Sequence, residues 1–259
     1  MADIDIDGAH ALAHTPSLGC CGLAEKDKVV WVTKLDGDRA KCQYRVLLSE
    51  LESEGHKQFI GIAPKLSEKV VEAALRNHLV QGLEVATIAR EKTILNSRFD
   101  FMGKTTSGNY YVCEVKSVPL ADFADVTTRE RKKLNFDHMN WDEKISYFPD
   151  GYRKNKKVPV SERAVKHIRE LQEIKERERS VQCVLMFVIP RTDVKWFQPS
   201  RLDQTYLNAV RDAWEAGVEI KTLQVTWGSD GICKYVRNDL PIMLFDEYCC
   251  PLPKKNRDT

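Results

Sequence analysis

The sequence predicts an α/β fold in two parts, a small β-barrel module over residues 1–63 and a layered α/β domain over residues 64–259. Residues 1–62 form short strand-like runs separated by glycine-containing turns. Beyond Pro64, strand patterns alternate with helical patterns, which is typical of layered α/β domains. A chain of 259 residues is long enough for one large domain or two modest ones.

Two stretches of the first part have strand patterns. Residues 3–7 alternate Asp with Ile, and residues 28–33 are rich in β-forming side chains. Ser67 is then expected to cap a helix from residue 68 to about residue 80. The apolar stripe of that helix would consist of Val71, Ala74, Leu75 and His78.

The second part continues with a hairpin, in which residues 93–102 and 110–118 are strands joined by a turn around Gly108. Ser161 is expected to cap a helix that ends near residue 180. Residues 181–189 are nearly all apolar, which indicates a strand covered on both faces. A helix over 203–216 and a strand over 218–226 complete the pattern. The inward face of the helix after Ser161 would carry Ala164, Ile168, Leu171 and Ile174.

Residues 121–160 form a basic insert with little apolar periodicity. Nine Lys or Arg stand against five Asp or Glu between residues 129 and 157. Such a run is either a DNA-gripping loop, a nuclear-targeting patch or a solvated, mobile segment, and the last is the commoner outcome. Its basic clusters are Arg129, Arg131, Lys132 and Lys133, then Arg153, Lys154, Lys156 and Lys157.

Composition excludes several classes of protein. The 40 Lys and Arg against 38 Asp and Glu give a net charge of +2, so overall charge does not indicate a nucleic-acid binder. The longest apolar run, Val184 to Pro190, is too short to span a bilayer, and the first ten residues do not resemble a secretory signal. Eight cysteines without a Cys-x-x-Cys pair are expected to be reduced thiols. We therefore expect an intracellular protein, cytoplasmic or nuclear, that does not bind a membrane.

The strongest site pattern is Asp100 followed by Glu114-Val-Lys116. The chain has four Glu-x-Lys triplets, but only this one lies on an expected strand paired with a second strand that carries a carboxylate. Because side chains alternate along a strand, Arg98, Asp100, Glu114 and Lys116 should share one face of the hairpin. Leu95, Phe99, Phe101, Tyr111, Cys113 and Val115 should face the other way.

Two explanations fit this face of the hairpin. Two neighbouring carboxylates resist joint ionisation unless a hard divalent cation such as Mg²⁺ binds them. A lysine beside the cation can position or deprotonate a water molecule for phosphodiester hydrolysis. Alternatively, the hairpin lies on the surface and carries a cross-strand salt-bridge ladder, worth about a few tenths of a kcal/mol per pair.

Several motifs resemble the SfsA (sugar fermentation stimulation) family. They run in order as residues 14–19 (His-Thr-Pro-Ser-Leu-Gly), 60–62, 97–101 (Ser-Arg-Phe-Asp-Phe), 114–118 (Glu-Val-Lys-Ser-Val), 148–150 (Phe-Pro-Asp), 163–171 and 213–218. The chain departs from the family pattern at Ser17, Leu18 and Ala164, and it has longer gaps after Lys116 and Asp150. Only thirteen residues precede His14, so the first strand of the barrel is expected to be absent.

The resemblance implies an N-terminal OB-like barrel, incomplete here, followed by a PD-(D/E)XK restriction-endonuclease-like α/β domain. In such a domain Asp100 and Glu114 would hold the metal, with the Val115 carbonyl as a further ligand, and Lys116 would be catalytic. The fold often adds an acid from its first helix, where Glu72 stands, although Glu72 fits a solvated helix surface equally well.

The resemblance also implies contacts with nucleic acid. Arg98 would either hold a phosphate or pair with Asp100. On the helix after Ser161, Arg163 and Lys166 would contact phosphates, and His167 would line the cleft. Glu170 lies on the same helix face. The alternative interpretation is that this is an ordinary charged helix face in contact with solvent.

The main hypothesis is a DNA-cleaving enzyme that depends on Mg²⁺ or Mn²⁺. The alternative is a non-cleaving, sequence-nonspecific DNA-binding regulator of sugar metabolism, whose binding would depend on salt and not on Lys116. A third possibility is an interaction protein that uses the basic insert. Any of these is compatible with a homodimer.

Overall fold

The computed structural model describes residues 1–15, 22–35, 41–149 and 161–245. The second basic cluster, the segment 16–19 of the first motif, and Asp150 lie outside the described residues. So do Cys20, Cys21, Cys249 and Cys250. The four cysteines within the described ranges, Cys42, Cys113, Cys183 and Cys233, are free thiols, as expected.

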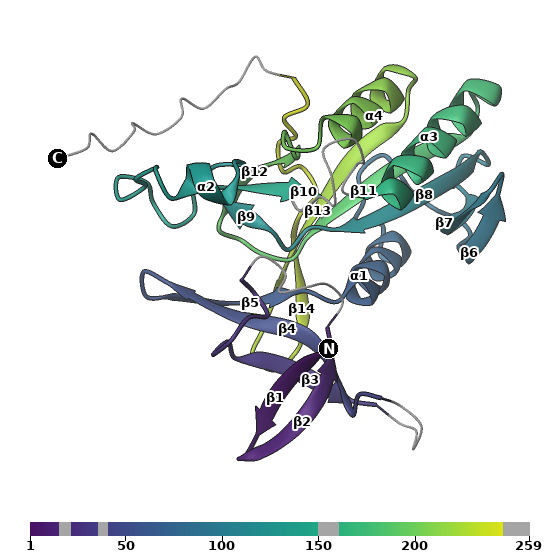
Figure 1. The fold of residues 1–259 in the computed structure, drawn as a ribbon. Helices are drawn as coiled ribbons and strands as arrows, with labels where there is room; N and C mark the ends of the chain where they lie inside the picture. Colours follow the sequence, from purple (N-terminus) through teal and green to yellow (C-terminus); the bar gives the residue numbers. More distant parts are fainter. Residues whose placement is uncertain (16–21, 36–40, 150–160, 246–259) are drawn as a thin grey trace.

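The N-terminal strands form a curled half-barrel, seen at the bottom of Figure 1. Antiparallel pairing joins β1 to β2, β3 to β4 and β4 to β5, while β2 runs parallel to β4. Ala13, Val46, Ile60 and Ile62 form its small core. The strands are β1 (Ala2–Ile6), β2 (Ala9–His14), β3 (Val30–Lys34), β4 (Tyr44–Ser53) and β5 (His56–Gly61).

The main sheet continues directly from this half-barrel. Phe59 of β5 pairs with Trp227 of β13 (Glu219–Trp227), so the two parts share one 11-stranded sheet. From β13 the order is β11 (Gln182–Ile189), β8 (Tyr110–Ser117), β7 (Ser97–Lys104) and β6 (Ala89–Ile94), and β14 (Cys233–Arg237) pairs with β13. Every residue of β11 after Gln182 is buried, which confirms the strand covered on both faces.

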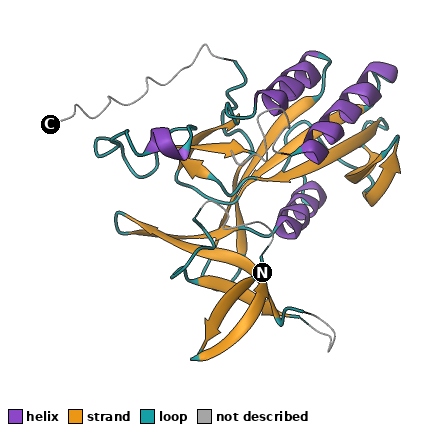
Figure 2. Cartoon of the chain, viewed as in Figure 1, coloured by secondary structure: helices purple, strands orange, loops and turns teal. Residues whose placement is uncertain are grey.

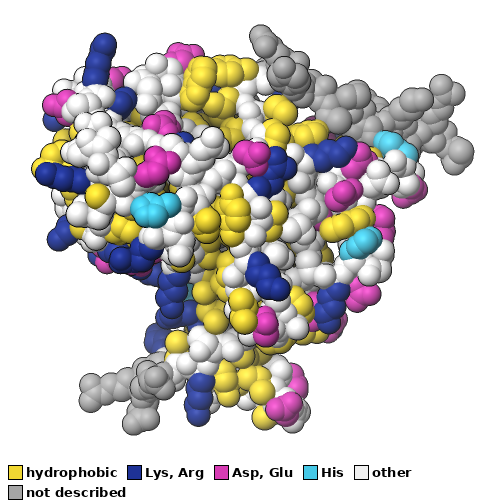
Figure 3. Space-filling view, turned by 180° about the vertical axis from the view of Figure 1, so that it is seen from behind, with side chains coloured by type: hydrophobic (Ala, Val, Ile, Leu, Met, Phe, Trp, Pro, Cys, Tyr) yellow, Lys and Arg dark blue, Asp and Glu magenta, His cyan; other side chains and the backbone are white. Residues whose placement is uncertain are grey.

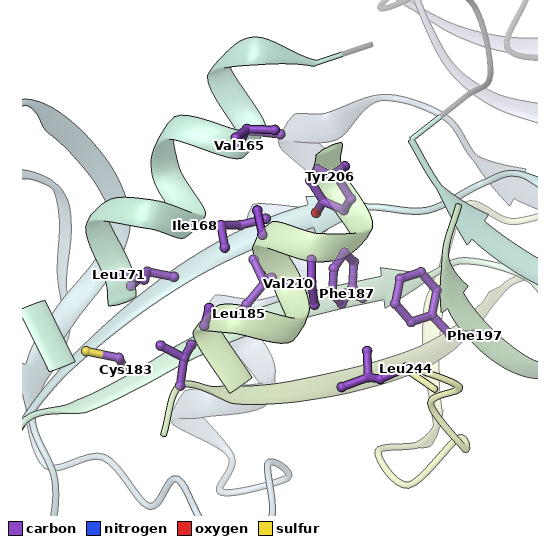
Figure 4. Packing of buried hydrophobic residues seen from close by; sticks show 14 of the residues in the cluster. Val165, Ile168, Leu171, Cys183, Leu185, Phe187, Phe197, Tyr206, Val210 and Leu244 are labelled. Atoms are coloured by element: carbon purple, nitrogen blue, oxygen red, sulfur yellow. The ribbon is translucent and has the colours of Figure 1, made fainter. Parts of the chain in front are cut away.

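Helices cover both faces of the main sheet (Figure 2). On one side, α1 (Pro64–Arg76) packs over a cluster that includes Val71, Leu75 and Tyr111. On the other side lie α3 (Glu162–Arg177) and α4 (Gln204–Glu215). Figure 4 shows Ile168 and Leu171 of α3 and Val210 of α4 packed against Leu185 and Phe187 of β11. The fold is therefore mixed α/β, as the sequence predicts.

The predicted start of α1 is wrong. The helix begins at Pro64, with Ala63 as N-cap, and Ser67 is buried within it. Proline favours the first helical position because its fixed φ suits the helix and its missing N–H would have no partner there. His78 lies beyond the helix at φ 52° and is exposed, so it is not part of the apolar stripe.

The helix α3 agrees with the prediction. Ser161 caps it by accepting a hydrogen bond from the Ala164 amide at 3.4 Å. Ala164, Ile168, Leu171 and Ile174 are all buried. By contrast, the predicted single strand over residues 93–102 is two strands, because the chain turns at Leu95, which has φ 53°.

The part of the insert that the structure describes contains regular structure, while Arg129, Lys132 and Lys133 of its first basic cluster are exposed, as expected for a solvated segment. Residues 121–149 contain β9 (Ala121–Asp122), α2 (Thr128–Arg131) and β10 (Lys144–Phe148). β10 pairs with β9 and with β12 (Val194–Pro199) to form a second, three-stranded sheet. Lys144 of β10 also forms a buried ion pair, in which its Nζ lies 2.6 Å from Asp193 Oδ2. Among the described residues, no helix is long and apolar enough to cross a membrane.

Candidate active site

Glu114 and Lys116 lie on the face of β8 that is turned toward α3. Lys116 Nζ is 2.6 Å from Glu114 Oε1, and the two side chains are only 12% and 4% exposed. Tyr111, Cys113 and Val115 point to the opposite face and join the core beneath α1. The alternation predicted for this strand is therefore confirmed, and its acidic and basic side chains are buried, unlike those of a surface ladder.

His167 reaches the same carboxylate from α3. Its Nδ1 lies 2.5 Å from Glu114 Oε1, and its side chain is 6% exposed. Arg163 Nε, which can only donate, lies 3.4 Å from His167 Nε2. The hydrogen of a neutral imidazole then belongs on Nδ1, which donates to Glu114. His167 thus faces a carboxylate, whereas the sequence suggested contact with nucleic acid.

Asp100 approaches from β7 at the point where the strand ladder stops. The β7–β8 pairing runs as far as Phe101 and Cys113, and the Asp100 Oδ2 then accepts the Val115 amide at 2.7 Å. The predicted alternation along β7 is wrong here, because Phe99 joins the core beneath α3 and Phe101 joins the core beneath α1. The Asp100 carboxylate has replaced a backbone carbonyl as the acceptor for the Val115 amide. Side chains of β7 therefore do not alternate regularly between the two faces of the sheet at this point.

The two carboxyl groups influence each other. Burial, together with the negative charge of Glu114, raises the pKa of Asp100 to about 6, against the stabilising Val115 amide. Burial also disfavours the ionised form of Glu114, but the hydrogen bond from His167 and the charge of Lys116 outweigh it and lower its pKa. The surroundings therefore shift the pKa values of the two carboxyl groups in opposite directions, as expected for neighbouring carboxylates.

The donor atoms of Asp100 and Glu114 are carboxylate oxygens, the type of ligand that a hard divalent cation takes. Glu114 Oε1 accepts hydrogen bonds from Lys116 and His167, whereas Glu114 Oε2 is buried and has no hydrogen-bond partner. A carboxylate oxygen without a partner beside a second carboxylate is the type of ligand that Mg²⁺ prefers, and Mg²⁺ needs few protein carboxylates because it retains several waters. Among the described residues, no group of three or more His, Cys, Asp or Glu is arranged to hold a metal ion.

The acids of α1 are arranged differently from the prediction for Glu72. Both carboxylate oxygens of Glu72 are engaged, one by Arg76 and the other by Arg90. Glu68, one turn earlier, is the α1 acid whose charge raises the pKa of Asp100. Lys65 and Arg90 both donate to Glu68 Oε2. Glu68 was missed because an isolated helical glutamate carries no sequence signal, although it stands at the i−4 position from Glu72.

The predicted nucleic-acid contacts lie at the rim of this site, except for His167. Arg98 is exposed and pairs with Glu91 at 3.5 Å, so it does not pair with Asp100. Lys166 Nζ donates to the Asn96 carbonyl at 2.7 Å and lies 3.7 Å from Glu170. Arg163 is exposed at the start of α3.

Together, the mixed α/β fold and this buried cluster of acids, lysine and histidine define an α/β protein with a candidate active site on its central sheet. The family model described as "Sugar fermentation stimulation protein RE domain" matches residues 65–231. The chain belongs to the SfsA (sugar fermentation stimulation protein) family.

Relatives and a solved structure agree with this assignment. A sugar fermentation stimulation protein homolog of Clostridium tetani is 30% identical over 225 residues, which cover 85% of this chain and 82% of the relative. A homolog of Clostridium kluyveri is 26% identical over 247 residues, or 94% and 92% of the two chains. A structure of Pyrococcus furiosus SfsA in complex with Ca²⁺ is similar in fold, with a TM-score of 0.66, 21% identity, and coverage of 91% and 85%.

Proposed function

We propose that this protein is a metal-dependent, nuclease-like DNA-binding protein that hydrolyses phosphodiester bonds. The observation that carries the proposal is the buried, unpartnered Oε2 of Glu114, whose Oε1 contacts Lys116 and whose charge raises the pKa of Asp100. Asp100 and Glu114 would hold Mg²⁺ or Mn²⁺, with the Val115 carbonyl as a further ligand. From α1, Glu68, whose charge raises the pKa of Asp100, joins the predicted Glu72 as a candidate acid.

Each side chain has a separate task in this proposal. The bound cation would polarise a phosphate oxygen and lower the pKa of a water molecule. Lys116 Nζ orients the attacking water, which gives up a proton to solvent as its oxygen bonds to phosphorus. The bond from phosphorus to one sugar oxygen breaks, and that oxygen takes up a proton from solvent water. Val115 N–H fixes the Asp100 carboxylate at its Oδ2. The burial of Lys116 and Glu114 limits access of bulk water to the reacting group.

A bound cation is supported by the chemistry of a relative. The solved Pyrococcus furiosus SfsA is described as a complex with Ca²⁺, a cation that takes oxygen ligands, as Mg²⁺ does. In this chain the carboxylate oxygens of Glu114 and Asp100 supply ligands of that type.

Binding of DNA rests on the cations at the rim. Arg98 and Lys166 are more than half exposed on their side chains, and Arg163 lies at the start of the same helix as Lys166. These side chains would contact phosphates. On the face of the molecule in Figure 3, however, Lys and Arg are interspersed with acidic and apolar side chains. On that face the described residues form no single extended basic surface, so DNA would bind there through a few separate cations at the rim of the site.

The arrangement of domains belongs to the same proposal. The curled half-barrel would be an incomplete OB-like module, and the rest of the chain a PD-(D/E)XK-like domain in which α1, the β6–β8 strands and α3 surround the site. The family model's match to residues 65–231 supports a division after residue 63.

A gel assay of DNA cleavage tests the proposal, with wild type, Asp100→Ala and Lys116→Ala, each in EDTA, Mg²⁺ or Mn²⁺. Cleavage should require metal and disappear in both variants. The matched control is Lys221→Ala, because Glu219-Ile-Lys221 is the same triplet on β13, with Lys221 Nζ 2.9 Å from Glu219. Metal-dependent cleavage by Asp100→Ala would overturn the assignment.

The same proteins distinguish the enzyme from the alternative, a DNA-binding regulator that does not cleave, when their DNA binding is measured. It predicts binding that weakens steeply with salt but is unchanged by EDTA or by Lys116→Ala. The set of Asp100, Glu114 and Lys116 favours the enzyme, because a protein that only binds DNA has no physical need for two neighbouring carboxylates and a lysine in its interior.

A further inference from the structure

We propose that His167 is a positioning residue for Glu114: together with Lys116 it occupies Oε1 and so keeps Oε2 of that carboxylate available to the metal. This inference rests on the proposed function, since it concerns the same metal site. It assigns to His167 a task different from the contact with nucleic acid that the sequence suggests.

The imidazole has little freedom to move. His167 is 5% exposed, and its ring lies against Phe99 with centroids 5.8 Å apart. The next residue, Ile168, and Leu171 anchor this part of α3 in the main core. The backbone and the neighbouring ring therefore hold Nδ1 at its 2.5 Å distance from Glu114 Oε1.

Two donors on one oxygen make the two carboxylate oxygens unequal. Lys116 Nζ and His167 Nδ1 both reach Oε1, which has two lone pairs, whereas Oε2 is buried with none of its lone pairs engaged. An unpartnered acceptor in the interior is costly unless a ligand completes it. The two hydrogen bonds also oppose rotation of the carboxylate, which would otherwise exchange its oxygens.

Arg163 fixes the direction of the His167 hydrogen bond. Its Nε–H points toward His167 Nε2, which therefore acts as the acceptor, and Nδ1 carries the hydrogen. Outer hydrogen bonds that set the tautomer of a histidine and the orientation of a metal-binding carboxylate are common around metal sites. Their loss typically lowers metal affinity by about 10- to 100-fold.

The deciding experiment is Ca²⁺ titration by isothermal calorimetry of the full chain as wild type, His167→Leu and His167→Asn. Ca²⁺ alone is the probe, so no cleavage is needed for the readout. His167→Leu removes the donor and should weaken Ca²⁺ binding by about 10- to 100-fold. His167→Asn places an amide N–H close to the position of Nδ1 and should bind Ca²⁺ within about 3-fold of wild type.

Rescue by asparagine separates positioning from a general loss of structure, since leucine and asparagine both shorten or reshape the side chain. His56→Leu is the control, because His56 stacks on Trp141 at 4.1 Å in another part of the molecule, and it should bind Ca²⁺ normally. Thermal unfolding of each variant shows whether it is folded at the titration temperature.

The outcomes distinguish the two proposals. Ca²⁺ binding by His167→Leu equal to wild type, or equal weakening in the leucine and asparagine variants, would overturn the role of His167 while leaving the metal site intact. Folded wild-type protein that binds no Ca²⁺ would instead overturn the metal site of the proposed function, and this inference with it.

Discussion

The carboxylate of Asp100 accepts a hydrogen bond from the backbone amide of Val115 at 2.7 Å. This contact replaces the next backbone hydrogen bond expected between β7 and β8. A catalytic candidate is thereby built into the sheet itself. Because the amide holds Oδ2, the position of Asp100 depends on the backbone of the strand that also carries Glu114 and Lys116. The geometry of the site is therefore coupled to the pairing of these two strands.

Asp100→Asn should stabilise the metal-free protein at neutral pH. The pKa of Asp100 is raised from 3.8 to about 6 in the folded state, so the native protein holds its proton more tightly than the unfolded chain does. The wild type consequently loses stability as the pH rises from about 4 to about 6, and Asn, whose amide oxygen still accepts the Val115 amide, avoids this loss. The gain should approach about 2–3 kcal/mol at pH 7 and be small near pH 3.

Urea unfolding in EDTA at several pH values measures this difference. Adding Mg²⁺ should then stabilise the wild type and leave Asp100→Asn unchanged, because the asparagine lacks the ligand charge. A stability difference that is the same at pH 3 and pH 7 would contradict the assigned shift.

Asp193→Asn should destabilise the protein strongly. Asp193 is completely buried between Arg191 and Lys144, with N–O distances of 2.6 Å to each. Removing its charge leaves two buried cations without a counter-charge, which costs about 3–5 kcal/mol. Asp239→Asn is the control, since Asp239 pairs with Arg237 on the surface, and its unfolding midpoint should not change.

The same carboxylate contributes to acid unfolding. Burial disfavours ionised Asp193, but Arg191 and Lys144 outweigh it and lower its pKa from 3.8 to about 2. A lowered pKa means stability that is complete above pH 4 and is lost as the pH falls from about 4 toward 2. Chemical unfolding of wild type between pH 2 and pH 6 should show this loss, and Asp193→Asn should lack that component.

Arg90→Ala should weaken the contact of α1 with the sheet more than Arg76→Ala does. Arg90 joins two α1 acids, with Nη2 3.0 Å from Glu68 and Nη1 2.5 Å from Glu72, and its guanidinium lies 5.4 Å from the Phe101 ring. Arg76 contacts Glu72 within the helix alone. We expect a loss of about 1 kcal/mol for Arg90→Ala and a few tenths for Arg76→Ala, measured by urea unfolding. Equal losses would show that Arg90 does not connect the two elements.

Gly103→Ala should be far more harmful than Gly108→Ala. A Cβ on Gly103 would lie 2.0 Å from the Thr87 carbonyl oxygen, so the backbone would have to move, at a cost of about 3 kcal/mol. Gly108 has φ +90° with nothing within 4 Å of the added atom, so alanine there adds only backbone strain of about 1 kcal/mol. Thermal unfolding of both variants tests the order, and the reverse order would exclude the close approach at Gly103.

Patterns within single elements predicted much of the fold. The cap and the inward face of α3, the buried strand β11, and the shared face of Glu114 and Lys116 all follow from local periodicity and are confirmed. Predictions failed where a neighbour in space overrode the local pattern. Leu95 turns the chain between β6 and β7, and the basic insert gains order by pairing β10 with β12, about fifty residues later in the chain.

The candidate site shows the same division. A strand period of two places Glu114 and Lys116 on one face from sequence alone, and the expected pairing of two strands adds Asp100 to them. That Glu68, and not Glu72, acts on Asp100 depends on how α1 and Arg90 sit against the sheet. The orientation of the His167 side chain toward Glu114 likewise depends on the packing of α3 over β8.

The α/β class, the elements with strong periodicity and the acid–lysine set on one strand are all predictable from the sequence, because each depends on residues close together in the chain. Three features could not be predicted in this way: which oxygen of Glu114 is engaged, which α1 acid acts on Asp100, and how the half-barrel joins the main sheet. Those features depend on side chains and strands far apart in sequence, and their distances and burial are set when the layers pack together.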